Sequence, residues 1–124
     1  MITSVDNLID DMLEVQRQLG DTTVRARANP SYRPAVIDMR RRFANAVLAV
    51  SSAIENDGFV QGQPELAAEF RHRFSEMRTK IAVFQAKWPA VLLDNHDPEF
   101  DRSAHKLRAD NQAFTEWARK ALKR

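Results

Sequence analysis

Residues 64–88, PELAAEFRHRFSEMRTKIAVFQAKW, decide the fold class because their apolar side chains recur at every third or fourth position. At 100° per residue these positions fall within about 80° of one another around a helix. They are Leu66, Phe70, Phe74, Met77, Ile81, Phe84 and Trp88. Pro64 stands where the first residue of a helix tolerates proline, and Pro89 interrupts the pattern. The stretch therefore predicts an amphipathic helix over residues 64–88.

The segments on either side predict two more helices, over residues 34–56 and 98–122. Pro34 opens the first of these, and the turn residues 56–58 stop it. Asp97, Pro98 and Glu99 form a strong start for the other, with a capping acid, a first-turn proline and an acid near the positive end of the helix dipole. The inner faces are Val36, Met39, Phe43, Val47, Val50 and Ile54 in the first, and Phe100, Ala104, Leu107, Phe114, Ala118 and Ala121 in the second.

Residues 4–19 predict the remaining helix. One side carries Ile2, Val5, Leu8, Ile9, Met12, Leu13 and Leu19. Thr3 and Asp6 resemble a capping box with the shorter acid, and Gly20 is placed to end the helix in a left-handed turn. Residues 21–33 show no sustained period and contain Asn29-Pro30-Ser31. We expect them to form a long and mobile connection.

These four segments predict an all-α single domain over residues 1–124, an antiparallel four-helix bundle in which up-down-up-down topology is favoured. No strand pattern competes with them. At 124 residues the chain is long enough to bury a core without a staple. Whether residues 90–93 continue the third helix after a kink or form a turn of their own stays open. Gln16, Arg40 and Asn111 fall on apolar stripes, where each either finds a partner inside, reaches toward a bundle end or faces another chain.

Composition and charge exclude several classes of protein. Cysteine is absent, which removes disulfides and thiolate chemistry. The first residues show no secretory signal, and charge-free stretches such as residues 43–54 are too short to span a membrane, so we expect a soluble, cytoplasmic protein. The formal net charge of +2 is too close to balance to indicate nucleic acid, so such a partner is unlikely from the sequence.

Charge is nevertheless unevenly distributed along the chain. Residues 1–21 hold five acids and one base, whereas residues 100–124 hold seven bases and three acids. The pattern favours a first and a last helix that lie side by side and attract each other weakly. The other reading is a basic interaction face on the last helix.

No pattern predicts a metal, a cofactor or an enzyme. His72 and Glu76 have helical spacing, but they fall on the polar face of their helix. His96 lies among the acids and amides of residues 94–101, where turn and capping chemistry explains each polar side chain without a cation. No nucleophile and base are paired by spacing, and no glycine-rich phosphate loop occurs. The sequence indicates neither a catalytic residue nor a small-molecule substrate.

Residues 104–108, Ala-His-Lys-Leu-Arg, resemble the segment around the phosphorylated histidine of histidine-phosphotransfer domains, which are also four-helix bundles of this size. The resemblance implies phosphorelay through an exposed His105, with Lys106 or Arg108 steadying the phosphoryl group. The chain departs from the family at Ala109, where the family carries glycine, and in having only 19 residues after His105.

The apolar run of residues 88–93 crosses a helix break, where connecting segments are ordinarily polar. It either covers the bundle's own end or faces a partner. The interaction candidates are Trp88, Val91, Leu92, Leu93 and Arg40. From these features the sequence favours a non-catalytic interaction module, an adaptor, regulator or chaperone-like bundle that binds another protein or a second copy of itself, with histidine phosphotransfer as the alternative.

Overall fold

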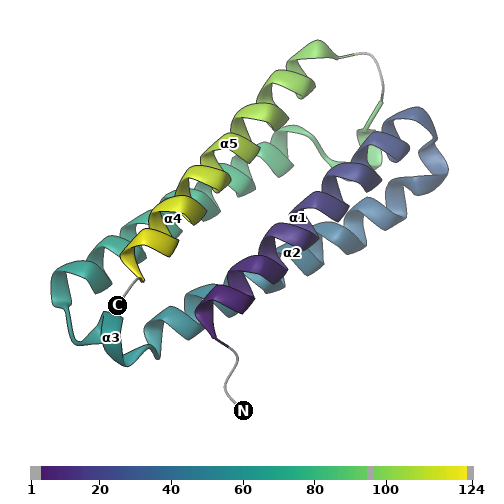
Figure 1. Cartoon of the computed structure of the whole chain (residues 1–124). Helices are drawn as coiled ribbons and strands as arrows, with labels where there is room; N and C mark the ends of the chain where they lie inside the picture. The colour runs from purple at the N-terminus through teal and green to yellow at the C-terminus, as the bar shows by residue number, and fades with distance from the viewer. Residues whose placement is uncertain (1–3, 95–96, 123–124) are drawn as a thin grey trace.

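The computed structural model describes residues 4–94 and 97–122, which are almost entirely helical and contain no strand (Figure 1). The all-α prediction is therefore confirmed. The long helices are α1 Val5–Ala28, α2 Arg33–Glu55, α4 Pro64–Lys87 and α5 Pro98–Ala121. The short elements are the one-turn helix α3 Gly58–Gln61 and the 3-10 turns η1 Pro30–Tyr32 and η2 Ala90–Leu92.

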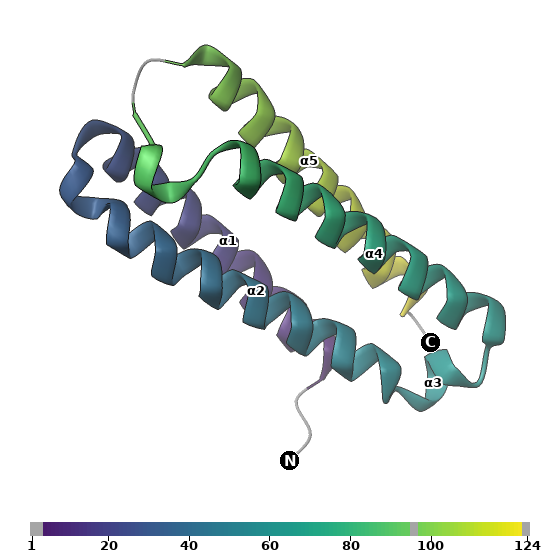
Figure 2. The same ribbon diagram turned by 180° about the vertical axis from the view of Figure 1, so that it is seen from behind.

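The long helices form two hairpins that lie against each other. Helix α1 runs alongside α2, and α4 runs alongside α5, each pair antiparallel (Figure 1). Seen from behind, α3 lies at one end of the molecule between α2 and α4, whereas η2 lies at the opposite end and contacts α2 (Figure 2). The segment after α4 therefore ties the second hairpin to the first.

The core consists of two clusters that follow the predicted apolar stripes. All six stripe positions predicted for residues 34–56 are buried in α2, as are Phe70, Phe74 and Met77 in α4. The larger cluster joins these α4 side chains to Ile9, Met12 and the α3 residue Val60. The smaller cluster, near η2, contains Ala26, Val36, Ala90, Leu93, Phe100 and Ala104. Each fully buried large side chain contributes about 1.5–3 kcal/mol relative to exposure.

Helix α1 has 24 residues and extends well beyond the predicted residues 4–19, so the expected stop at Gly20 is wrong. Gly20 is helical, and the helix continues to Ala28. The reason is tertiary: Ala26 is fully buried in the smaller cluster. The true end is at Asn29, whose backbone N–H donates to the Arg25 carbonyl at 2.8 Å. The expected long connection over residues 21–33 is therefore mostly helix, and only η1 separates α1 from α2.

Two local features also differ from expectation. The first cap of α1 is Ser4, whose Oγ accepts a hydrogen bond from the Asn7 N–H at 3.1 Å; the predicted cap Thr3 lies outside the described residues. Residues 56–58 do stop α2, but the chain then forms α3, which the sequence did not predict. The Asp57 carboxylate accepts from the Val60 N–H at 3.0 Å, and Val60 is fully buried beneath it.

Candidate functional site

Helices α1 and α5 are joined by long polar side chains along one line, here called the seam. Arg27 pairs with Asp101 at one end of the seam, and Arg119 pairs with Asp10 at the other. The Arg119–Asp10 pair has the polarity that the charge pattern of the first and last helices predicts, whereas the Arg27–Asp101 pair has the opposite one.

Between these two ion pairs the seam opens into a groove of about 620 Å³. It is lined by Leu13, Gln16, Arg17, Gly20, Asp21 and Val24 of α1 and by His105, Arg108, Ala109 and Gln112 of α5. A Cβ atom built on Gly20 meets no atom of the described helices within 4 Å, so the space beside Gly20 is open. The groove is therefore open where the two smallest lining residues, Gly20 and Ala109, lie.

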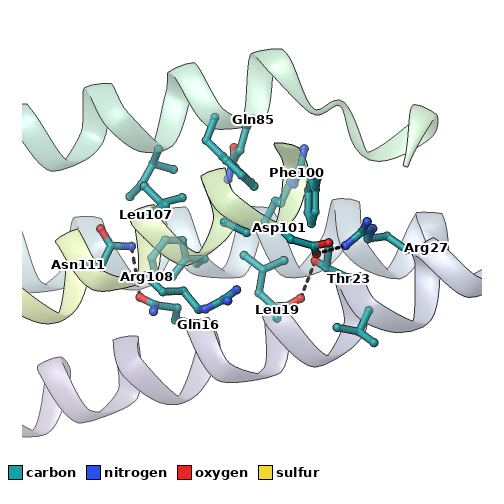
Figure 3. Close-up of a pocket in the computed structure, with 17 residues that line it drawn as sticks. Gln16, Leu19, Thr23, Arg27, Gln85, Phe100, Asp101, Leu107, Arg108 and Asn111 are labelled. Carbon is teal, nitrogen blue, oxygen red and sulfur yellow. Dashed lines mark hydrogen bonds and ion pairs between the residues drawn. The ribbon is translucent and has the colours of Figure 1, made fainter. Parts of the chain in front are cut away.

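A cavity of about 180 Å³ lies between all four long helices (Figure 3). Its apolar wall includes Leu19, Phe43, Ile81, Phe84, Phe100 and Leu107. Its polar lining includes Gln16, Thr23, Arg27, Arg40, Gln85, Asp101, Arg108 and Asn111. Gln16, Gly20, Val24 and Arg108 line both the cavity and the groove. The central cavity and the groove therefore adjoin at the seam.

Arg40 places a guanidinium at the central cavity. The side chain is half-buried, and its Nη2 donates to the Trp88 carbonyl at 2.7 Å. Burial lowers the pKa of Arg40 from its ordinary value of 12.5. Among the described residues no carboxylate pairs with it, although a guanidinium offers five donors. The cavity wall thus contains a partly desolvated cation for which residues 4–94 and 97–122 provide no ion-pair partner.

Asn111 lines the same cavity and contains an acceptor that has no partner in the described chain. Its side chain is only 2% exposed, and its Nδ2 donates to the Gln16 Oε1 across the seam at 3.3 Å (Figure 3). Its Oδ1 is buried and has no hydrogen-bond partner in the described chain. An unsatisfied buried acceptor costs about 1–3 kcal/mol. Asn111 is therefore a buried polar residue with one hydrogen-bond acceptor that the described chain leaves unsatisfied.

The three polar residues on apolar stripes thus have a common location. Asn111 is buried, Gln16 and Arg40 are half-buried, and all three line the central cavity. Their position on the stripes marked them in the sequence, but their convergence depends on how four helices meet. Gly20 was misread as a helix end, so its place at the groove had no sequence signal.

The segment after α4 forms a separate turn, which settles the alternative left open by the sequence. Trp88 ends α4, and η2 follows Pro89. Val91 is 57% exposed and Leu92 is 70% exposed, whereas Leu93 is 3% exposed and belongs to the smaller core cluster. Of the candidate contact residues, Val91 and Leu92 lie on the surface, Trp88 is half-buried, and Leu93 faces inward.

Two arginines of α2 hold this turn from both sides. Arg40 donates to the Trp88 carbonyl before η2, and the Arg33 Nε donates to the Leu93 carbonyl after it at 3.1 Å. Both carbonyls lie outside regular helices, so they need hydrogen-bond donors from elsewhere, and the two guanidinium groups provide charged ones. The backbone of the turn is thereby fixed against α2.

The remaining sequence candidates are dispersed. His105 is exposed on α5 at the edge of the groove, with Arg108 one turn further on. On the exposed face of α4, the His72 Nε2 lies 2.6 Å from the Glu76 Oε1. His96, which the sequence places among acids and amides between two helices, lies outside the described residues. Within residues 4–94 and 97–122 no three His, Asp or Glu side chains gather as a metal site would require.

The basic residues do not form one patch. Arg41 and Arg42 both pair with Asp38, at 2.6 and 3.1 Å, and Arg73 pairs with Glu69 at 2.7 Å. These three arginines are therefore paired with acids one turn away on their own helices.

None of the helices formed by the described residues has an apolar stretch long enough to cross a membrane. No protein-family model, no curated protein and no solved structure matches the chain.

Proposed function

We propose that the chain is a non-catalytic interaction module, an adaptor, regulator or chaperone-like antiparallel four-helix bundle of the cytoplasm that binds another protein or a second copy of itself. The contact surface is the η2 surface, defined as Val91, Leu92 and the α2 residue Ile37. The observation that carries the proposal is the exposure of Leu92 and Val91 on a turn whose backbone is held on both sides.

Ile37 extends the exposed apolar surface onto α2. It is 51% exposed and lies between Arg33 and Arg40, the two residues that hold η2. Positions 33, 37 and 40 share one side of a helix because they are spaced by four and three residues. Ile37 therefore lies on the side of α2 that η2 contacts.

A fixed apolar turn suits binding better than a flexible one. Ordering a loop at an interface costs conformational entropy, and a turn already fastened by Arg33 and Arg40 avoids much of that cost. A few side chains that are buried in a partner's pocket supply most of the energy of such contacts. The fitting partner is thus a protein that offers an apolar pocket to Leu92.

The test places a photo-crosslinking amino acid at Val91 in the full-length protein and identifies its adducts in extract of the native cells. Leu92→Asp is combined with this label, and Leu48→Asp is the matched control because Leu48 is an exposed leucine on α2 outside the η2 surface. We expect one dominant adduct, reduced at least tenfold by Leu92→Asp and unchanged by Leu48→Asp. Light scattering of the purified protein identifies the adduct as a second copy if the mass doubles.

Equal loss in both variants, or no adduct at Val91, would contradict the proposal. Circular dichroism of each variant shows that the helices are retained. Leu93→Asp is unsuitable here because the buried Leu93 belongs to the core.

The second candidate function is phosphorelay through His105. The observation in its favour is that His105 lines an open groove together with Arg108, on the exposed side of α5. Incubation with phosphorylated response regulators tests it: an acid-labile phosphate that disappears in His105→Gln supports the transfer, and its absence rejects it.

A further inference from the structure

We propose that the central cavity is a binding site for a small aromatic carboxylate with a single ring. The proposal does not rest on the proposed η2 surface, although Arg40, which lines the cavity, also holds the η2 turn. It follows from three properties of the cavity: its size, its apolar wall and the half-buried guanidinium of Arg40.

The size of the cavity limits the ligand to about one ring. Its volume is about 180 Å³. A dry apolar protein cavity of roughly 150 Å³ binds benzene, so a monocyclic molecule is the right scale. A larger ligand would have to extend into the groove.

The wall favours an aromatic ring. Phe43, Phe84 and Phe100 line the cavity from three different helices, α2, α4 and α5. The Phe84 and Phe100 rings already contact each other, with centroids 5.5 Å apart in a tilted arrangement. A ligand ring can add edge or offset contacts to such a group, which are worth more than burial of area alone.

The charge on the wall selects an anion. Three arginines and one aspartate line the cavity, and the Arg27–Asp101 pair is internally neutral. Arg40 and Arg108 are left without an ion-pair partner in the described parts of the chain. Arg40 is the stronger anchor because it is half-buried, where an ionic hydrogen bond competes less with water. A carboxylate would supply the counter-ion that Arg40 lacks.

The groove at the seam provides the path of entry. Gln16, Gly20, Val24 and Arg108 belong to both spaces, and the space beside Gly20 is open. An arginine at the point where the two spaces adjoin also attracts an anion toward the cavity.

The experiment is a titration of the full chain with three matched probes, followed by calorimetry and by amide NMR shifts. The probes are 4-hydroxyphenylacetate, acetate, which lacks the ring, and 4-hydroxyphenethyl alcohol, which lacks the carboxylate. We expect 4-hydroxyphenylacetate to bind about tenfold more tightly than either relative, with shifts concentrated at residues that line the cavity. Equal affinity for the three probes, or no binding at millimolar concentration, would overturn the proposal.

A pair of variants tests the anchor. Arg40→Gln removes the half-buried guanidinium, and Arg78→Gln removes an exposed arginine of α4 that does not line the central cavity. We expect Arg40→Gln to weaken 4-hydroxyphenylacetate at least tenfold and Arg78→Gln to leave its affinity unchanged. The same affinity in both variants would reject the assigned anchor. If Arg40→Gln does not fold, the probe series on the unmodified protein still decides.

The result is separable from that of the η2 surface. Leu92→Asp should abolish the protein contact and leave probe affinity unchanged, because Leu92 does not line the central cavity.

Discussion

Gly20→Ala should stabilise the protein, and the sign of its effect reports whether α1 continues through this position. Gly20 is an interior residue of a 24-residue helix, and its φ is not positive. Alanine is favoured over glycine in a helix interior by about 0.8–1.0 kcal/mol, because glycine loses more backbone entropy on folding. A Cβ at Gly20 meets no atom within 4 Å, so no steric cost opposes this gain.

The expected gain is therefore about 1 kcal/mol in the free energy of unfolding. With a urea m-value of about 1–3 kcal/mol/M, the midpoint should move upward by about 0.3–1 M with no change in slope. In a chain of this size the melting temperature should rise by about 3–5 °C. Urea denaturation and thermal denaturation, each followed by circular dichroism at 222 nm, measure the midpoint and the melting temperature.

Gly62→Ala is the matched control. A Cβ there would lie 3.1 Å from the backbone oxygen of Gly58, which is too close for an easy fit. We expect no gain, or a loss, at this position. If Gly20→Ala lowers stability by 1 kcal/mol or more, then Gly20 adopts a left-handed cap conformation and α1 ends where the sequence alone suggested. That outcome would remove the groove at the seam as described here.

Two further predictions concern the region where α4 meets α5 and η2. The hydrogen bond from Lys87 at 2.5 Å lowers the pKa of Glu99 below 4.5. The stabilisation from this pair is therefore present above about pH 4.5 and is lost as the pH falls through the folded-state pKa of Glu99. In Lys87→Met, carboxyl NMR titration should show the Glu99 pKa moving back toward 4.5, and an unchanged pKa would contradict the pairing. Leu93→Ala should cost about 2–5 kcal/mol in urea denaturation and Leu92→Ala less than about 0.5 kcal/mol, because only Leu93 is buried; similar losses in both would show that η2 is placed wrongly.

The helices could be predicted from the sequence wherever a stripe and a boundary residue agreed. Residues 34–56 illustrate this, because the six apolar positions and Pro34 all point to the same helix, which the structure contains as α2. The prediction failed in residues 20–28, where local signals and tertiary contacts disagree. Gly20 favours a stop, but burial of Ala26 and the pairing of Arg27 with Asp101 stabilise the longer helix. Contacts with residues 70 or more positions away are not contained in a local pattern.

The candidate site depends on the distance between helices, which a stripe does not encode. A stripe states which side of α5 faces inward, and it correctly placed Asn111 on that side. It does not state that α5 and α1 are held by long side chains at the two ends of the seam while Gly20 and Ala109 leave the middle open. The ion pairs at the two ends of the seam and the opening between them have one cause. Polar and small side chains along α1 and α5 prevent close apolar packing where these two helices meet. Alanine in place of Gly20 and an apolar residue in place of Asn111 should both stabilise the fold. Core packing therefore does not explain why the seam between α1 and α5 is open.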